Sequence, residues 1–152
     1  MSWAPKDKVL VPIDFSEFCI NALSVARDLV RDVKGLHVVH VIAIPGVPAP
    51  TLVAAGEQSS DEANANDAEA RLKGILRDRD LADAQAVVVL DEKTYRYSVG
   101  VTIAKYARDI GAELIVIPTH GATGLRRLMI GSTAHQVLRH AECPVLLLPH
   151  AA

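Results

Sequence analysis

The chain has 152 residues, half of them hydrophobic but only 4% aromatic, so we expect a core of Val, Leu, Ile and Ala, as in buried parallel sheets. This length predicts a single domain over residues 1–152. The formal net charge of −2, from 16 basic and 18 acidic residues, gives no global electrostatic reason to bind nucleic acid or an anionic membrane.

The N-terminal residues and the cysteines indicate the cellular compartment of the protein. The first eight residues lack the apolar segment of a secretory signal, and no apolar run approaches the ~20 residues of a membrane span. We therefore expect a cytoplasmic protein. Cys19 and Cys143 are far apart and flanked by apolar residues, which predicts two reduced core thiols.

The first part of the chain predicts a strand, a helix and a second strand. The apolar run 8–13 stops at Asp14, as a buried strand does. A helix should follow, with Gly35 as its left-handed C-cap, because apolar residues recur every three or four positions (Phe18, Ala22, Val25, Ala26, Leu29, Val30 and Val33). Residues 36–43 predict a central strand with His37 and His40 on opposite faces.

The next part predicts a long connection and a second helix. Residues 44–60 are rich in Pro, Gly, Ala and Ser, which indicates a flexible loop. Ser59 and Glu62 have the spacing of a capping box. The helix predicted after them has an apolar side formed by Ala65, Ala68, Leu72, Ile75 and Leu76.

The remaining elements continue the alternation. They are a strand over 85–90, a helix from about Gly100 to a C-cap at Gly111, a strand over 113–118, a helix over 132–140 and a strand over 144–148. This order predicts an α/β fold with a parallel sheet covered by helices on both faces. Ligands of such folds bind at the carboxyl ends of the strands, near a switch point.

The segment between the fourth strand and the last helix is the strongest indication of a ligand. Nine residues separate Gly121 from Gly131, and a helix opens on Gly131, Ser132 and Thr133. Free backbone N–H groups and two hydroxyls there could hold a phosphate. A purely structural interpretation is equally consistent, with turn glycines and Ser132 as an ordinary N-cap.

Two other side chains could meet a ligand. Asp14 could bond a ribose or adenine, but Asp14 and Glu17 also have capping-box spacing, and the residue alone favours a helix cap. His120 could be an acid–base group, a phosphate contact or an exposed turn residue. The histidines do not cluster as metal ligands, and the motifs GxxxxGK[ST], GxGxxG, GxSxG, HExxH and CxxC are absent, so no catalytic residue or protein metal site is predicted.

Two long segments closely resemble the universal stress protein family: VLVPIDFSEFCINAL near the start and LIVIPTHGATGLRRLMIGSTAHQVLRHAECPVLLLP at the end. The resemblance implies a Rossmann-like (adenine nucleotide alpha hydrolase-like) fold with a five-stranded parallel sheet in the order 3-2-1-4-5. It also implies a homodimer and an adenine nucleotide at the junction of strands one and four. The nucleotide would be ATP, or else AMP or ADP, with Mg²⁺ or Mn²⁺ on its phosphates.

The family's ligand contacts can be carried over by position. ATP-binding members have Gly, two residues, Gly, nine residues and then Gly-Ser or Gly-Thr. Gly121 and Gly131 match this pattern, but Pro118 stands at the first glycine and offers neither an N–H nor a positive φ. The resemblance favours Asp14 as a ribose ligand, whether or not it also caps the helix. The expected nucleotide-binding residues are Pro12, Ile13, Asp14, Val41, Pro118, His120, Gly121, Gly131, Ser132 and Thr133.

The resemblance favours a stress-response regulator that binds an adenine nucleotide and hydrolyses it slowly at most. Two alternatives stay open: a dimeric scaffold without nucleotide, which Pro118 supports, and a weak ATP hydrolase or phosphotransferase with His120 as acid–base group. The apolar edge strand Val145–Leu148 is expected to pair with its own copy across a twofold axis. Neither nucleic acid nor a membrane is expected as a partner.

Overall fold

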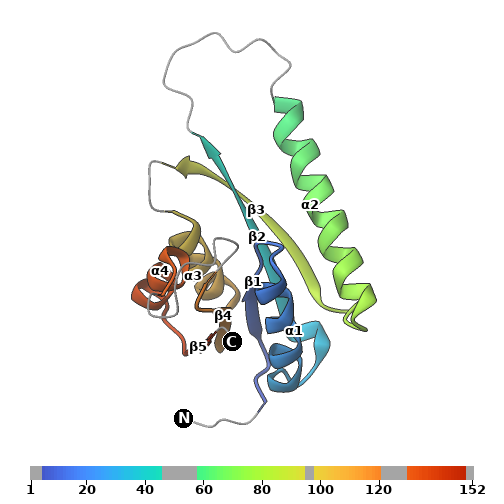
Figure 1. Cartoon of the computed structure of the whole chain (residues 1–152), viewed down its shortest axis with the longest axis vertical. Coiled ribbons are helices and arrows are strands. Elements are labelled where there is room, and N and C mark those ends of the chain that lie inside the picture. Colours follow the sequence, from blue (N-terminus) through green and yellow to red (C-terminus); the bar gives the residue numbers. More distant parts are fainter. Residues whose placement is uncertain (1–4, 46–57, 95–97, 121–129, 150–152) are drawn as a thin grey trace.

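The computed structural model describes residues 5–45, 58–94, 98–120 and 130–149. Strands and helices alternate along them, as the sequence predicts (Figure 1). The elements are β1 (Val9–Pro12), α1 (Glu17–Leu29), the short 3₁₀ helix η1 (Val33–Gly35), β2 (Leu36–Pro45), α2 (Gln58–Asp78), β3 (Gln85–Thr94), α3 (Ser98–Ile110), β4 (Leu114–Pro118), α4 (Ser132–His140) and β5 (Val145–Leu148).

The strands form one parallel sheet in the order β3-β2-β1-β4-β5, which confirms the predicted topology. Successive residues of a strand point to opposite faces, so each central strand supplies side chains to two cores. Val9 and Val11 pack with α1 and α2 on one face, whereas Leu10 packs with α3 and α4 on the other. Helices therefore cover both faces of the sheet.

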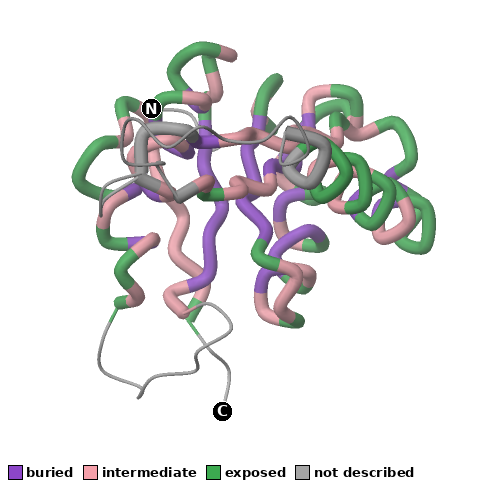
Figure 2. The backbone as a smooth tube through the Cα atoms, turned by 90° about the horizontal axis from the view of Figure 1, so that it is seen from above, coloured by how far each residue is buried: buried purple, intermediate pink, exposed green. Residues whose placement is uncertain are grey.

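The core is aliphatic, as the composition predicts. The buried hydrophobic side chains of the described residues are Val, Leu, Ile and Ala, together with Cys19. Buried residues concentrate in the central strands, and exposed ones lie mainly on the outer sides of the helices (Figure 2). No helix in the described part of the chain combines the length and the apolar character needed to cross a bilayer.

Helix α1 begins two residues later than a cap at Asp14 would require. Its N-cap is Ser16, whose hydroxyl accepts a hydrogen bond from the Cys19 N–H at 3.4 Å. Asp14 Oδ1 accepts instead from the Ser16 N–H at 2.9 Å. Phe15 between them has a φ of 63°, which closes the turn. The prediction of Asp14 as the helix cap is therefore wrong.

The two glycines predicted as C-caps behave differently. Gly111 follows α3 with a φ of 67°, which confirms a left-handed cap. Helix α1 ends at Leu29 with an extended C-cap at Val30, and Gly35 closes η1 instead, so the cap predicted there is wrong. A Cβ at Gly35 would overlap the backbone carbonyl of Asp7, so close approach of a distant segment requires this glycine.

Strands β2 and β3 are longer than predicted, and they pair over most of their length. Strand β2 runs to Pro45, and β3 runs to Thr94. Helix α2 begins at Gln58, so Ser59 lies within the helix and the capping box predicted there is wrong. Residues 46–57 of the predicted loop lie outside the described residues.

Candidate functional site

A cavity of about 350 Å³ opens at the carboxyl ends of β1 and β4. Strand β1 pairs with both β2 and β4, and the chain runs outward from β1 to β3 before it returns to β4. The cavity therefore lies at the switch point, where open α/β sheets bind ligands. Its volume is within the range of about 300–1,000 Å³ that is usual for small-molecule sites.

The structure brings nine of the ten predicted site residues to this cavity: Pro12, Ile13, Asp14, Val41, Pro118, His120, Gly131, Ser132 and Thr133. The tenth, Gly121, lies outside the described residues. Thr119, the first residue of the predicted phosphate-binding segment, also lines the cavity, and sequence reasoning missed the other lining residues: Cys19, Val39, His40, Val99, Ile103, Ile117 and Ala134. Most of these are apolar, and the only available signal was their place near a strand's carboxyl end or a helix's first turns.

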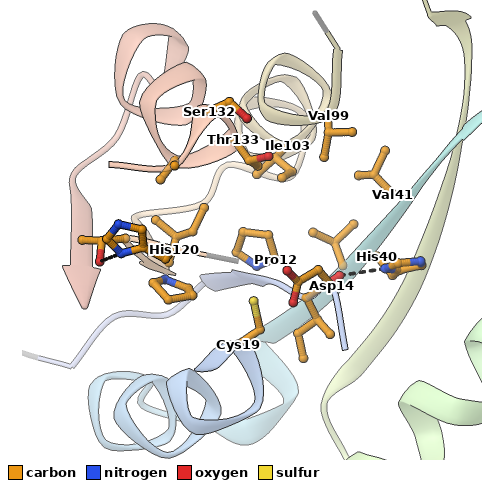
Figure 3. A pocket seen from close by; sticks show the side chains of 17 residues that line it. Pro12, Asp14, Cys19, His40, Val41, Val99, Ile103, His120, Ser132 and Thr133 are labelled. Carbon is orange, nitrogen blue, oxygen red and sulfur yellow. Dashed lines mark hydrogen bonds between the residues drawn. The ribbon is translucent and has the colours of Figure 1, made fainter. Parts of the chain in front are cut away.

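Different kinds of side chain line different parts of the cavity (Figure 3). Val41 and Val99 form an apolar end, and His120 lies at the other end. Between them, Asp14 projects from the β1 side and Thr133 faces it from α4. Asp14 is the only charged side chain among the described lining residues.

The N-terminus of α4 opens on this cavity without a side-chain cap. Gly131 is the N-cap, so the interpretation of Ser132 as an ordinary cap is wrong. The Gly131 N–H donates to the Thr119 carbonyl at 2.6 Å. The next three amides, of Ser132, Thr133 and Ala134, are among those that an α-helix leaves without an intrahelical acceptor, and all three residues line the cavity. Such a helix end attracts an anion.

The turn that presents Asp14 is held by hydrogen bonds. The Asp14 side chain is exposed to the cavity, and Ser16 N–H bonds one of its carboxylate oxygens. The Cys19 thiol, in a residue only 5% exposed, lies near the Asp14 side chain (Figure 3). Burial above all, and then the interaction with the Asp14 carboxyl, raise the pKa of Cys19 to about 11. The thiol is therefore protonated at neutral pH.

A row of side chains in contact supports the same turn, and His40 at its end also lines the cavity. The Arg71 guanidinium lies 4.2 Å from the centroid of the Phe15 ring, and that ring lies 4.5 Å from the His40 ring. His40 Nδ1 is 2.7 Å from the Ile13 carbonyl oxygen. Because a carbonyl can only accept, this nitrogen carries the hydrogen. These contacts thus connect α2 to the backbone that lines the cavity.

Pro118 and His120 form the wall at the end of β4. Ile115 and Thr119 donate their N–H groups to β5, so the nitrogen of Pro118 points the other way, toward β1 and the cavity. A glycine would offer an N–H there, and proline offers none. His120 Nδ1 is 2.9 Å from the Thr119 hydroxyl, and its buried Nε2 has no hydrogen-bond partner among the described residues.

Among the described residues, the cysteines and histidines do not form a metal site. Cys19 is buried and Cys143 half-buried, and both are free thiols. His37 and His40 contact different neighbours, Tyr106 and Phe15, which confirms that they lie on opposite faces of β2. Within the described ranges, no three His, Cys, Asp or Glu side chains gather as metal ligands would.

Comparison with known proteins agrees with the fold. The sequence profile of the universal stress protein family matches residues 6–149. Universal stress protein MJ0531 of Methanocaldococcus jannaschii is 30% identical over 145 residues, which cover 93% of this chain and 81% of that protein.

Solved structures share the same architecture. Universal stress protein UspA from Lactobacillus plantarum superposes with a TM-score of 0.68 at 22% identity, over 95% of this chain and 99% of that one. A universal stress protein from Archaeoglobus fulgidus, solved in complex with dAMP, gives a TM-score of 0.59 at 22% identity, over 97% of this chain and 98% of that one. The sheet order, the profile match and the 30% identical relative together show that the chain belongs to the universal stress protein family.

Proposed function

We propose that this protein binds an adenine nucleotide, ATP in the first place, in the cavity between β1 and β4. The nucleotide acts as a regulatory ligand in a stress response and is hydrolysed slowly at most. The observation that carries the proposal is the order of the groups that line the cavity: an apolar end, a carboxylate and a helix N-terminus without a side-chain cap. This order matches the base, the ribose and the phosphates of a nucleotide.

The base and the ribose would occupy the part of the cavity near β2. Val41 and Val99 offer apolar surface for the faces of an adenine ring. Asp14 lies on the turn after β1, where its carboxylate can accept hydrogen bonds from ribose hydroxyls. Pro12 and Ile13, at the end of β1, line the same part of the cavity, where the Ile13 N–H is bonded to the Val39 carbonyl and the Ile13 carbonyl to His40.

The phosphates would meet the start of α4. The first-turn amides and the hydroxyls of Ser132 and Thr133 supply donors there, and the helix dipole favours negative charge. With Asp14 assigned to the ribose, no other described carboxylate lines the cavity. A Mg²⁺ or Mn²⁺ ion that accompanies ATP would therefore take its ligands mainly from phosphate and water.

Support also comes from the family. The Archaeoglobus fulgidus protein of the same fold was solved in complex with dAMP, an adenine nucleotide. We extend adenine nucleotide binding to this chain because its own residues supply the required groups. We further propose that the protein is cytoplasmic and forms a homodimer through β5.

One observation favours a second candidate, a family member that serves as a dimeric scaffold without nucleotide. Pro118 withholds an N–H at the position where ATP-binding members have a glycine. The amides of α4 lie beyond that position and are unaffected by the proline. We therefore favour binding, and the two candidates differ in a simple measurement.

Thermal unfolding with and without ATP and Mg²⁺ tests the proposal. A ligand that binds only the native state at about 100 times its Kd raises the free energy of unfolding by ~2.7 kcal/mol, which raises the melting temperature by several degrees. In Gly131→Asp, a carboxylate at the N-cap of α4 would repel phosphate while still serving as a cap, so ATP should no longer shift the melting temperature.

Ala70→Asp is the matched control, because it adds the same charge on an exposed position of α2. Its melting temperature should respond to ATP as the wild type does. If millimolar ATP leaves the wild type unchanged, the scaffold is the better description. Phosphate release measured on the same samples would reveal an ATP hydrolase.

A further inference from the structure

We propose that His40 is a positioning residue of the nucleotide site, whose imidazole holds the Ile13 carbonyl and thereby leaves the backbone edge of Val41 open to the base. The inference rests on the proposed function and deepens it. It assigns a role to a side chain that the sequence alone places on a strand without a function.

The His40 ring bonds the backbone at the point where β1 ends. Its Nδ1 lies 2.7 Å from the Ile13 carbonyl oxygen, and Figure 3 draws this bond as a dashed line. The Phe15 ring contacts the imidazole at a centroid distance of 4.5 Å, and Phe15 in turn contacts the Arg71 guanidinium at 4.2 Å. Contacts with the turn after β1 and with α2 thus restrain the imidazole while it donates.

The hydrogen bond from His40 takes the place of the next bond between β1 and β2. The Ile13 N–H donates to the Val39 carbonyl at 2.8 Å, so Val39 and, two residues on, Val41 direct their backbone groups to the β1 side. In a regular parallel ladder, the Val41 N–H would donate to the Ile13 carbonyl. Among the described residues no such bond is present, and this carbonyl meets His40 instead.

Val41 therefore presents an N–H and a carbonyl at the edge of the cavity that it lines. These two groups offer one donor and one acceptor. Adenine carries the complement, an amino donor beside a ring nitrogen that accepts, whereas hypoxanthine has an oxygen acceptor in place of the amino group. The open edge of Val41 therefore favours ATP over ITP.

The competing interpretation is that His40 only packs against Phe15. Loss of packing would weaken the binding of ATP and ITP alike and would leave the Val41 N–H as it is. Loss of the donor would instead release the Ile13 carbonyl, which could then accept from Val41 and close the edge.

Two substitutions separate these effects. His40→Phe keeps an aromatic ring against Phe15 but has no donor. His40→Asn loses the ring but keeps an N–H donor on an atom bonded to Cγ, as Nδ1 is.

Hydrogen exchange measured by NMR on the nucleotide-free protein reports directly on the Val41 N–H. We expect this amide to exchange at least about tenfold more slowly in His40→Phe than in the wild type, because it gains a hydrogen bond. In His40→Asn it should exchange at the wild-type rate.

Isothermal titration calorimetry with ATP and with ITP, each with Mg²⁺, reports on the base. In the wild type we expect ATP to bind about tenfold more tightly. His40→Phe should reduce this preference by about threefold or more, and His40→Asn should retain most of it. His37→Phe is the matched control, because it makes the same change on β2 away from the cavity, and it should alter neither the preference nor the exchange of Val41.

The outcomes separate this inference from the function on which it rests. An unchanged Val41 exchange rate or an unchanged preference in His40→Phe, or an equal loss of preference in His40→Phe and His40→Asn, would overturn the positioning role. Equal affinity of the wild type for ATP and ITP would overturn it too, while nucleotide binding itself would stand. If the wild type binds neither nucleotide, both proposals fall.

Discussion

Single side chains decide how the turn after β1 presents its carboxylate. Asp14 would cap α1 if the chain entered the helix directly. Instead, the left-handed Phe15 delays the helix, Ser16 becomes the cap, and Asp14 lines the cavity. Cys19, in the first turn of this helix, lines the same cavity. The candidate site therefore depends on one unusual backbone conformation and the hydrogen bonds around it.

The state of the Cys19 thiol gives a prediction about its reactivity. Its pKa of about 11 lies well above the ordinary 9.0, so at pH 8 its thiolate fraction is roughly a hundredfold below that of an ordinary thiol. Burial slows reaction further. We therefore expect iodoacetamide at pH 8 to modify Cys19 at least about a hundredfold more slowly in the native protein than in urea, as followed by peptide mass spectrometry.

Cys143 serves as the internal reference, because it is half-buried and also reacts in the unfolded chain. Rapid native labelling of Cys19 would mean that its sulfur is ionised or accessible.

Among the elements, the approach of α3 to α4 fixes the cavity wall opposite Asp14. Gly100 lies in the first turn of α3 against α4, and its N–H donates to the Gln136 side chain at 3.3 Å. A Cβ on Gly100 would lie 2.7 Å from the carbonyl oxygen of Thr133 and 2.5 Å from the Cβ of Gln136. The glycine thus lets α4 bring its N-terminus close to the rest of the site.

Gly100→Ala should therefore reduce both stability and binding. To admit the methyl group, α3 and α4 must separate, which costs about 1–3 kcal/mol of the free energy of unfolding. Because Thr133 moves with α4, affinity for ATP should also fall. Urea unfolding measures the first effect, and calorimetric titration of the folded variant measures the second.

Gly74→Ala is the matched control. Gly74 lies within α2, and a Cβ there would meet nothing within 4 Å. This variant should gain about 0.5–1 kcal/mol from helix propensity and bind ATP unchanged. If Gly100→Ala is as stable as the wild type, α3 and α4 can accommodate the methyl group without separating, and the prediction is wrong.

The elements themselves were predictable, but their ends were not. Apolar runs and helical spacing are local, so they predict the strands, the helices and, with the family resemblance, the sheet order. Gly35 and Gly111 both follow an apolar helical stripe, yet of these two only Gly111 adopts a positive φ. Gly35 ends η1, where Asp7 from a distant segment leaves no room for a Cβ. Asp14 and Ser59 likewise have capping spacing without being caps.

The candidate site, too, was predictable from the sequence only in part. Its predicted residues lie at the carboxyl ends of strands or the start of a helix, places that follow from element order and from the family pattern. His40 and Cys19 were missed, because their contacts depend on the turn at Phe15 and on neighbours remote in sequence. Nothing in the spacing of residues 14–19 indicates that the backbone turns left-handed there.

At the scale of the whole molecule, the two edge strands of the sheet differ in the elements that lie against them. Strand β3 lies alongside α2, whereas β5 is a short apolar strand at the opposite edge, where its side chains are half-buried (Figure 1). Exposed apolar edges promote association unless they are covered. Two copies related by a twofold axis would cover each other's β5, and this closed arrangement limits further assembly.

The hydrogen-bond pattern of β5 shows which residue to change. The carbonyls of Pro144 and Leu148 accept from β4, so the alternate residues Val145 and Leu147 direct their backbone groups to the open edge. Leu147→Pro removes one outward donor from each copy and leaves the bonds to β4 in place. Two lost hydrogen bonds per dimer weaken dimerisation by about 2 kcal/mol, or roughly thirtyfold in Kd.

Sedimentation velocity over a range of concentrations distinguishes the states. The wild type should be a dimer, and Leu147→Pro should dissociate at concentrations where the wild type does not. Leu147→Val shortens the side chain but keeps the donor, so it should remain dimeric and thereby separate lost pairing from lost packing. A monomeric wild type, or a proline variant that dimerises normally, would show that β5 is not the interface, because no other change was made at that edge.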